Sequence, residues 1–436
     1  MVSKSRQSYS VRILVEPSDY VLRNAGDMAM LRTGVSRLVQ KWPGALIQVL
    51  SDAPDALEAF CPEVTPLLSA GRQYWLRMVR ASERFPRVVR HHAPELIEFL
   101  WRRKLGWQNR AGLADLREFT NAVANADLVI VTGMGGITDA FPEYAADLLE
   151  TLALAVRCRR YVAMVGQGFG PLHSPKLVAR ARVVLPHIDF IGIREDRASL
   201  PLLLSLGVTS DRVMTTGDDA IEMVYRLRRD SLGEGFGVNL RIADYSGVDQ
   251  SLLEPLRQVL RDATQARRVP MVPLPISRVP GEADIEAIQY LMDVNDDSLR
   301  DGSPLEALDA VVRQVQKCRL VITGSYHAGV FALANGIPTI GLAKSTYYID
   351  KFMGLSALFG PGCETVLLEK QDFAQHLKDA IARLWNAAER FKPLLLANAA
   401  RQIELGHEAY DRIGAAVSSR IMRKAESSID RARRKS

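Results

Sequence analysis

Short apolar runs alternate along the chain with longer segments of helical periodicity. The apolar runs include residues 11–15, 46–50, 128–131 and 161–165, and turn-forming residues follow them. A segment such as 144–156 repeats its apolar positions every three or four residues, as an amphipathic helix does. Strands that alternate with helices in this way predict parallel sheets covered by helices, and therefore an α/β fold.

The densest example of this pattern lies at residues 317–355. In order, the segment predicts a strand, a turn, a helix of small residues and a second strand, at 320–322, 323–326, 328–335 and 339–342. Gly336 and Pro338 end the predicted helix. The segment is therefore a βαβ unit, whose crossover implies parallel strands.

Polar side chains follow both strands of this unit. Ser325, Tyr326 and His327 come after the first strand, and Lys344, Ser345 and Tyr347 come after the second. Ligands of open α/β sheets bind beyond the carboxyl ends of the strands, so we expect these side chains to share one crevice. The N–H groups at the start of the helix favour an anion there. A purely structural role for His327, as a cap or a packing residue, is the alternative.

The first half of the chain has further polar groups after its predicted strands. They are Asp27, a glycine turn with Gly135 and Gly136, Gln167, Arg194 and Asp219. In the second half, Arg241 follows another apolar strand. Arginine in such a position can bind a carboxylate or a phosphate through two N–H groups. An internal ion pair is the alternative for Arg194, and a favourable charge at a helix start is the alternative for Asp27.

The glycine turn at 132–136 is not a dinucleotide fingerprint. It lacks the Gly-x-Gly-x-x-Gly order and the acidic residue at the expected distance. Its surroundings, DLVIVTGMGG, are instead echoed by CRLVITGSYHAG at 318–329. The two halves of the chain therefore follow one strand-turn-helix plan.

Several of these motifs together resemble the polysaccharide pyruvyl transferase family. They are Asn24-Ala25-Gly26-Asp27, the glycine turn, Gly-Gln-Gly-Phe-Gly-Pro at 166–171, Arg194-Glu195, Thr323-Gly324 with His327, Gly-Ile-Pro at 336–338 and Lys-Phe-Met-Gly-Leu at 351–355. The resemblance runs from about residue 11 to about residue 385. Many family members carry Arg two residues before the His, where this chain has Ser325. This departure suggests that Tyr326, Lys344 or Lys351 supplies the missing contact.

The resemblance implies two doubly wound Rossmann-like domains in a GT-B-like arrangement, with a cleft between them. We expect an N-terminal α/β domain at 1–225, on the acceptor side, with a basic helical insert at about 69–120. A C-terminal α/β domain at 226–392 would form the donor side. Residues 393–436 would form a terminal helix and a solvated basic tail.

The resemblance also implies a reaction, in which the pyruvyl group of phosphoenolpyruvate moves onto a sugar as a ketal and phosphate is released. His327 would be the general acid, since its unperturbed pKa lies near neutrality. Arg194 and Arg241 would hold the carboxylate and phosphate, and Asp27 or Asp219 would accept a hydroxyl proton. Substrate contacts are also expected from Ser325, Tyr326, Lys344, Gly135, Gly136 and Gln167. A glycosyltransferase that uses a nucleotide sugar, or a non-catalytic glycan- or anion-binding protein, are the alternatives.

Composition narrows the class of protein. The chain has 436 residues, 47% of them apolar, which is enough for two domain cores. Its four cysteines are scattered without paired spacing, so we expect a reduced, cytoplasmic protein with no zinc site, and we expect no metal or cofactor elsewhere. No run approaches the roughly 20 apolar residues of a membrane span. The net charge of +6 is small for a nucleic-acid partner, and we expect none.

The basic charge is concentrated between Arg72 and Arg110. This stretch has ten Lys or Arg and three Glu, interleaved with three tryptophans. A helical insert with a charged surface and docked aromatics is one interpretation. The second is peripheral association with an anionic membrane, where the sugar acceptor would be lipid-linked; in that case Arg77, Arg80, Arg84 and Arg87 would contribute to binding.

Overall fold

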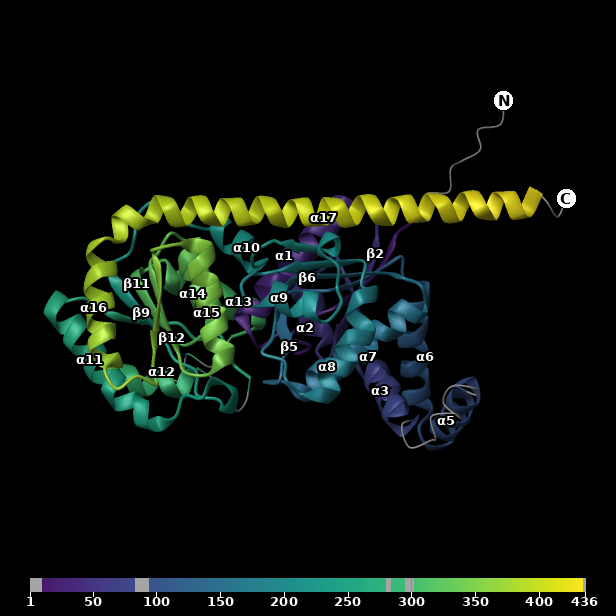
Figure 1. Cartoon of the computed structure of the whole chain (residues 1–436), viewed down its shortest axis with the longest axis horizontal. Helices are drawn as coiled ribbons and strands as arrows, with labels where there is room; N and C mark the ends of the chain where they lie inside the picture. Colours follow the sequence, from purple (N-terminus) through teal and green to yellow (C-terminus); the bar gives the residue numbers. More distant parts are fainter. Residues whose placement is uncertain (1–9, 83–93, 280–283, 295–298, 300–301, 434–436) are drawn as a thin grey trace, which may run out of the picture.

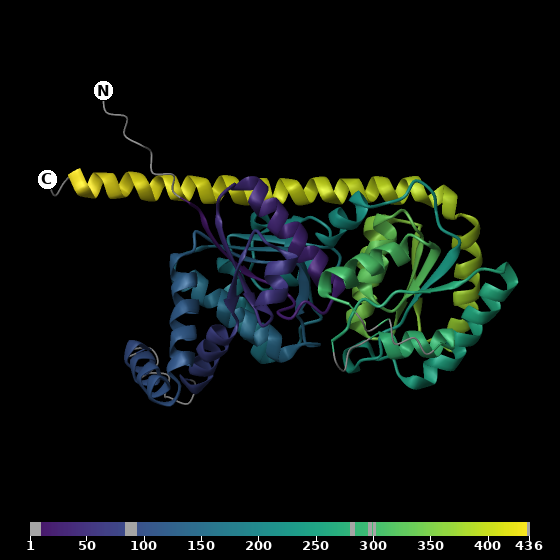
Figure 2. The ribbon, with the colours of Figure 1, turned by 180° about the vertical axis from the view of Figure 1, so that it is seen from behind.

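The protein is described by a computed structural model, which covers residues 10–82, 94–279, 284–294, 299 and 302–433 (Figure 1). Two parallel sheets lie side by side along the long axis of the molecule, and helices cover both. Figure 2 shows the same arrangement from behind. The α/β class with parallel sheets is therefore confirmed.

The N-terminal sheet has the strand order β3-β2-β1-β4-β6-β7-β8, and β5 pairs with β6. Its strands are β1 (Arg12–Glu16), β2 (Leu46–Ser51), β3 (Thr65–Leu68), β4 (Leu128–Val131), β5 (Met134–Ile137), β6 (Tyr161–Phe169), β7 (Phe190–Ile193) and β8 (Val213–Thr215). The accompanying helices are α1 (Ala25–Lys41), α2 (Pro54–Phe60), α3 (Ala70–Ser82), α5 (Pro94–Gln108), α6 (Arg110–Asn125), α7 (Pro142–Arg157), α8 (Pro175–Val184), α9 (Ser199–Ser205) and α10 (Ala220–Arg226). Two short 3-10 helices lie at Leu185–His187 and Ser210–Arg212.

The C-terminal sheet has the strand order β10-β9-β11-β12-β13. Its strands are β9 (Gly235–Asn239), β10 (Met271–Pro273), β11 (Cys318–Thr323), β12 (Thr339–Ala343) and β13 (Cys363–Leu367). The helices that accompany this sheet are α11 (Leu253–Arg267), α12 (Ile285–Met292), α13 (Pro304–Val315), α14 (Tyr326–Ala334), α15 (Thr346–Phe359) and α16 (Phe373–Asn386). Two 3-10 helices, η3 (Asp244–Ser246) and η4 (Gln250–Leu252), lie between β9 and α11.

The βαβ unit predicted at 317–355 is present as β11, α14 and β12, and β11 pairs with β12 in parallel. Helix α14 begins at Tyr326, earlier than predicted, because Ser325 adopts the extended N-cap conformation. His327 therefore lies in the first helical turn. The glycine turn is a correction: Met134–Ile137 forms strand β5 beside β6, since β6 continues to Phe169 and offers it a partner.

The last helix, α17 (Ala388–Arg433), returns from the C-terminal sheet to the N-terminal one. At 46 residues it is about 70 Å long, at 1.5 Å per residue. Both views show it running along the two domains (Figures 1 and 2). It contacts α14 and α15 of the second domain and α1, α10 and β6 of the first. The predicted basic tail falls outside the described part of the chain, which includes neither the side chains of Arg431–Arg433 nor residues 434–436.

The described part of the basic insert is helical, as predicted, and includes α3, α5 and α6. Its first turns belong to the core: Arg72 is 2% exposed and ion-pairs with Glu16 at 3.1 Å, and Trp75 is 5% exposed. Arg80 pairs with Asp147 on α7. Of the four arginines named for membrane binding, Arg84 and Arg87 lie outside the described residues.

Candidate functional site

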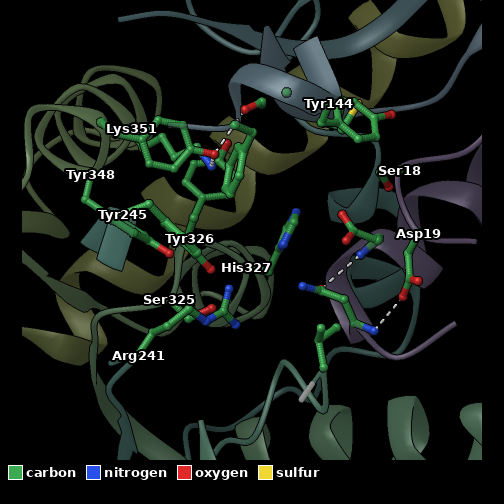
Figure 3. A pocket seen from close by; sticks show the side chains of 18 of the residues that line it. Ser18, Asp19, Tyr144, Arg241, Tyr245, Ser325, Tyr326, His327, Tyr348 and Lys351 are labelled. Carbon is green, nitrogen blue, oxygen red and sulfur yellow. Dashed lines mark hydrogen bonds between the residues drawn. The ribbon is translucent and has the colours of Figure 1, made fainter. Parts of the chain in front are cut away.

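A cavity of about 230 Å³ lies between the two domains, at the carboxyl ends of both sheets (Figure 3). The first domain contributes Ser18, Asp19, Asn24, Asp27, Met134, Gly135, Gly136, Phe141, Tyr144 and Arg194. The second contributes Arg241, Tyr245, Val279, Ser325, Tyr326, His327, Tyr347, Tyr348 and Lys351. Parallel strands end at one edge of each sheet, so residues distant in sequence meet where the two edges face each other.

The first turn of α1 holds the two domains together at the cavity. Asn24 caps this helix, since its side-chain oxygen accepts from the backbone N–H groups of Gly26 and Asp27 at 3.0 and 3.3 Å. The backbone N–H of Ala25 donates to the carbonyl of Ile276 in the second domain at 2.9 Å. Asp27 is thereby placed opposite the second domain's residues.

His327 lies against Asp218 and Arg194. Its Nε2 is 3.7 Å from Asp218 Oδ2, and Arg194 Nε is 2.9 Å from the same oxygen. Arg194 also donates to the carbonyl of Gly166 at 2.7 Å and lies over the ring of Tyr326. The alternative of an internal ion pair for Arg194 is thus realised, although this arginine also lines the cavity.

Burial and charge set the protonation states of this group. Burial, with smaller contributions from Arg194 and Lys351, lowers the pKa of His327 to about 4 against the opposing effect of Asp218. Burial would raise the pKa of Asp218, but Arg194 and His327 outweigh it and hold that pKa at about 2. Near neutral pH, His327 is therefore a neutral imidazole beside a carboxylate.

The pKa of Asp27 is raised, whereas those of His327 and Asp218 are lowered. Burial in the cavity wall, together with the carboxylate of Asp19, raises the pKa of Asp27 to about 7. Asp19 itself caps the preceding turn, since its carboxylate accepts from the backbone N–H groups of Val21 and Asn24. A carboxyl group that is half protonated near neutrality can donate or accept a proton in the cavity.

Arg241 is held from behind by Asp284. Its Nε and Nη2 lie 2.8 and 3.2 Å from the two carboxylate oxygens of this fully buried aspartate. Asp284 also accepts from the side chain of Asn239 and the backbone of Ile276. Because the carboxylate orients the guanidinium, Arg241 presents its remaining edge to the cavity that it lines.

Lys351 lies among aromatic rings. Its Nζ contacts the hydroxyl of Tyr347 and is 4.0 Å from the centre of that ring, with Tyr326 and Tyr348 at 5.6 and 5.8 Å. Burial, with help from Arg194, lowers the pKa of Lys351 well below its ordinary value. A Cβ at Gly135 would lie 3.0 Å from Lys351 Cε, so a glycine here lets strand β5 approach the amine.

Three residues predicted to bind substrate lie outside this cavity. Gln167 is buried and donates to the carbonyls of Thr132 and Val165, because the strand β6 continues through it. Asp219 accepts from Arg37 of α1 at 2.6 Å. Lys344 pairs with Asp249 on the surface at 2.8 Å. Unlike the prediction for each, these three side chains do not line the cavity and are paired elsewhere.

Two buried carboxylates that hold the cavity arginines, Asp218 and Asp284, are not among the site residues predicted from the sequence. Asp218 and Asp219 follow β8 in the same loop, so position after a strand does not separate them, and Asp284 lies just before α12, not directly after a strand. Lys351 and Tyr347, which are expected at this crevice from the sequence, line the cavity from α15, and Tyr348 of the same helix lines it beside them. Ser325 lines the cavity as predicted, and its side chain does not cap α14.

Within the described ranges, no group of three His, Cys, Asp or Glu side chains is arranged to hold a metal ion. Across the same described part of the chain, no helix is both long and apolar enough to cross a membrane.

Solved structures with the same fold are GT-B-like proteins. A protein from Listeria monocytogenes assigned as a UDP-N-acetylglucosamine 2-epimerase has a TM-score of 0.56 at 14% identity, with 95% of this chain and 97% of that chain covered. UDP-GlcNAc 2-epimerase from Neisseria meningitidis, bound to UDP-GlcNAc, has a TM-score of 0.52 at 13% identity, covering 94% and 100%. S. aureus MnaA with UDP has a TM-score of 0.54 at 14% identity, covering 93% and 94%. The GT-B-like arrangement of two Rossmann-like domains is therefore confirmed.

No curated protein matches the chain by sequence. The family model described as polysaccharide pyruvyl transferase matches residues 24–346, which extend from the N-cap of α1 to the start of α15. This range includes most of the cavity residues from both domains. The chain belongs to the polysaccharide pyruvyl transferase family.

Proposed function

We propose that this protein transfers the pyruvyl group of phosphoenolpyruvate onto two hydroxyls of a sugar, as a cyclic ketal, and releases phosphate. The observation that carries the proposal is the cavity itself, which brings Arg194, Arg241 and Lys351 together with one neutral histidine and one carboxyl group of raised pKa. Two guanidinium groups and an amine whose protonation a bound anion favours suit a small substrate with a carboxylate and a phosphate. Family membership supports a transferase that acts on a glycan.

The cations divide into two kinds. Arg194 and Arg241 are permanently charged and already hold buried carboxylates, so their free edges are rigid donors for the substrate anion. Lys351 has a lowered pKa among its tyrosines, and a bound anion would raise it again. Lys351 thus takes the place that many family members give to an arginine at the position of Ser325.

The two titratable groups exchange the roles that unperturbed pKa values suggest. With a pKa of about 7, Asp27 is the general acid, and His327, neutral above a pKa of about 4, is the general base. A bound anionic substrate raises the pKa values of both Asp27 and His327, so the pKa of Asp27 stays above that of His327. This assignment replaces the prediction that His327 donates the first proton.

The reaction then balances in four proton movements. Asp27 protonates C3 of phosphoenolpyruvate, and a sugar oxygen bonds to C2 while its proton passes to His327. The C2–O bond to phosphate breaks, and His327 returns its proton to the departing phosphate. The second hydroxyl bonds to C2, and its proton restores Asp27. Sugar, phosphoenolpyruvate and enzyme thus yield ketal, phosphate and unchanged enzyme.

A phosphate-release screen tests the proposal. Phosphoenolpyruvate is incubated with the protein and a panel of lipid-linked and nucleotide-linked glycans, and the mass of the acceptor is measured. We expect phosphate release with a mass gain equal to one pyruvyl ketal. His327→Gln should abolish both signals, whereas His376→Gln, an exposed residue of α16, is the matched control.

A glycosyltransferase that uses a nucleotide sugar is the second candidate, and the fold shared with proteins solved with UDP or UDP-GlcNAc favours it. Protection against heat by a nucleotide diphosphate, with none by phosphoenolpyruvate, would support this candidate and contradict ours. Binding of phosphoenolpyruvate without turnover of any acceptor would instead favour a non-catalytic protein. The four cysteines are free thiols, which supports our proposal of a cytoplasmic location.

A further inference from the structure

Helix α5 exposes large apolar side chains at one end of the molecule. Phe99 is 58% exposed, Leu100 53% and Trp107 86%. Both views show α5 at the end of the N-terminal domain, away from α17 and from the second domain (Figures 1 and 2). An exposed cluster of this kind on a soluble surface marks an interaction site more often than a packing defect.

These side chains lie on one face of α5. At 100° per residue, Phe99, Arg103 and Trp107 follow each other along the helix, with Leu100 and Lys104 beside them. Arg103 and Lys104 are also exposed. The face therefore presents apolar and basic side chains together.

The opposite face of α5 fixes the helix to the domain. Leu105 is 8% exposed and belongs to the core cluster that includes Trp75 and Leu116. A Cβ at Gly106 would lie 2.8 Å from Leu113 on α6, so these two helices are in close contact. The exposed face thus has a defined orientation.

The charge of α5 indicates which kind of partner its exposed face binds. Helix α5 contains three Lys or Arg and two Glu, and both Glu precede Phe99, so the stretch from Phe99 to the end of the helix carries the three cations alone. A protein partner recognised by apolar contacts alone would not need this excess, whereas an anionic lipid surface attracts each cation and accommodates tryptophan at its interface. Arg72 and Trp75, which the sequence placed in the same basic region, are buried and take no part.

We propose that α5 is an interfacial helix that binds the surface of an anionic lipid bilayer, with Phe99, Leu100 and Trp107 entering the headgroup region and Arg103 and Lys104 contacting lipid phosphates. Both components are needed, since a helix lying in the interface gains from buried apolar area and from charge. The binding does not depend on the proposed reaction.

Vesicle co-sedimentation tests this with the full chain and no substrate. We expect binding to vesicles of phosphatidylcholine mixed with phosphatidylglycerol at low salt, weaker binding at high salt, and none to phosphatidylcholine alone. The double variant Arg103→Gln/Lys104→Gln should lower the partition coefficient up to about 25-fold, at roughly fivefold per charge. Trp107→Ala with Phe99→Ala should abolish binding.

The matched controls are Arg390→Gln and Met422→Ala on α17, which remove an exposed cation and an exposed apolar side chain elsewhere and should leave binding unchanged. Phosphate release with a water-soluble acceptor should be the same in all of these variants. Absence of binding to anionic vesicles at low salt overturns the proposal, as does full binding by the α5 variants. Concentration-dependent dimers that Trp107→Ala abolishes, without vesicle binding, would instead assign this face to a second copy of the chain.

Discussion

Gly26 of the first domain lies directly against His327 of the second. A Cβ on Gly26 would be 2.0 Å from His327 Cγ and 2.1 Å from Nδ1, closer than any two such atoms can approach. The absence of a side chain at Gly26 thus lets the start of α1 contact the imidazole. This contact fixes the ring between the two domains.

We therefore expect Gly26→Ala to displace His327 and to lower turnover by about 10²-fold or more, the contribution of one positioned general base. Gly34→Ala, on the same helix, is the matched control, because its nearest neighbour is the Tyr410 hydroxyl at 3.0 Å. Turnover in a phosphate-release assay and the melting temperature are measured for both. Wild-type turnover by Gly26→Ala would contradict the role of this contact.

The pKa of Asp27 predicts the alkaline limit of activity. Because the acid must be protonated, kcat/KM should fall as pH rises above about 7, and because His327 must be neutral, it should fall below about 4. Asp27→Asn should lower turnover about 10²- to 10⁴-fold and remove the alkaline limb from the remaining activity. An unchanged alkaline limb in this variant would assign that ionisation to another group.

The same pKa affects stability. The folded protein keeps the Asp27 proton up to about pH 7, whereas the unfolded chain releases it near the ordinary value of 3.8, so ionisation of Asp27 lowers stability as pH rises between these values. The folded protein keeps His327 neutral down to about pH 4, whereas the unfolded chain protonates it near 6.5, so this residue makes stability rise with pH between these values. Each effect is isolated by comparing a variant with the wild type: Asp27→Asn should gain stability relative to it from pH 4 to 7. Urea unfolding at several pH values measures this, and a constant difference would contradict it.

Replacing Arg194 should lower the stability of the fold as well as weaken substrate binding. Arg194→Ala leaves the buried carboxylate of Asp218 without its closest cation, which should destabilise the fold by about 3–5 kcal/mol and weaken the binding of phosphoenolpyruvate. Arg180→Ala is the control, since its pair with Glu150 is partly exposed and is worth about 0–1 kcal/mol. Denaturation and donor titration separate the two effects. Unchanged donor affinity would leave Arg194 with a structural role alone.

The buried ion pairs of Arg37, which lies between α10 and α17, predict a large contribution of this arginine to stability. Arg37 contacts Asp219 and Glu222, all three buried, and lies over the ring of Tyr410 on α17. Arg37→Met should therefore cost about 3–5 kcal/mol of stability, because the buried carboxylate of Asp219 loses its cation while Glu222 keeps Arg226 and His407. Lys41→Met is the control, because its pair with Asp411 is exposed. Equal melting temperatures for the two variants would contradict this.

Metal removal should have no effect on the proposed reaction. The cavity residues supply cations from Arg194, Arg241 and Lys351, and the described residues contain no metal-binding group. We expect full phosphate release after dialysis against EDTA. Inactivation that a divalent ion reverses would show that this chemistry needs a metal.

Much of the site could be predicted because of one geometric rule. Asp27, Arg194, Arg241 and His327 each follow a parallel strand, and the strands of each sheet end at the cavity. The same rule could not distinguish Asp218 from Asp219, since both follow β8 in one loop. One of them points to Arg194 and the other to Arg37, and this difference depends on the packing of α1 and α17.

Lys344 and Lys351 show the same limit. Both follow β12, and proximity to the strand favoured Lys344. Lys344 lies in the connection between β12 and α15 and pairs with Asp249 on the surface, whereas Lys351, in the second turn of α15, lies among the tyrosines. A helix distributes its residues around its axis, so distance along the sequence does not say which one faces a cavity.

The sequence by itself determined the βαβ units, the parallel sheets and the strand ends that carry polar groups, because these depend on local periodicity and turn residues. Only the tertiary structure decided the protonation of Asp27 and His327, the pairing of Asp218 and the close contact at Gly26. The physical reason is that pKa values and packing depend on burial and on charges brought together from both domains.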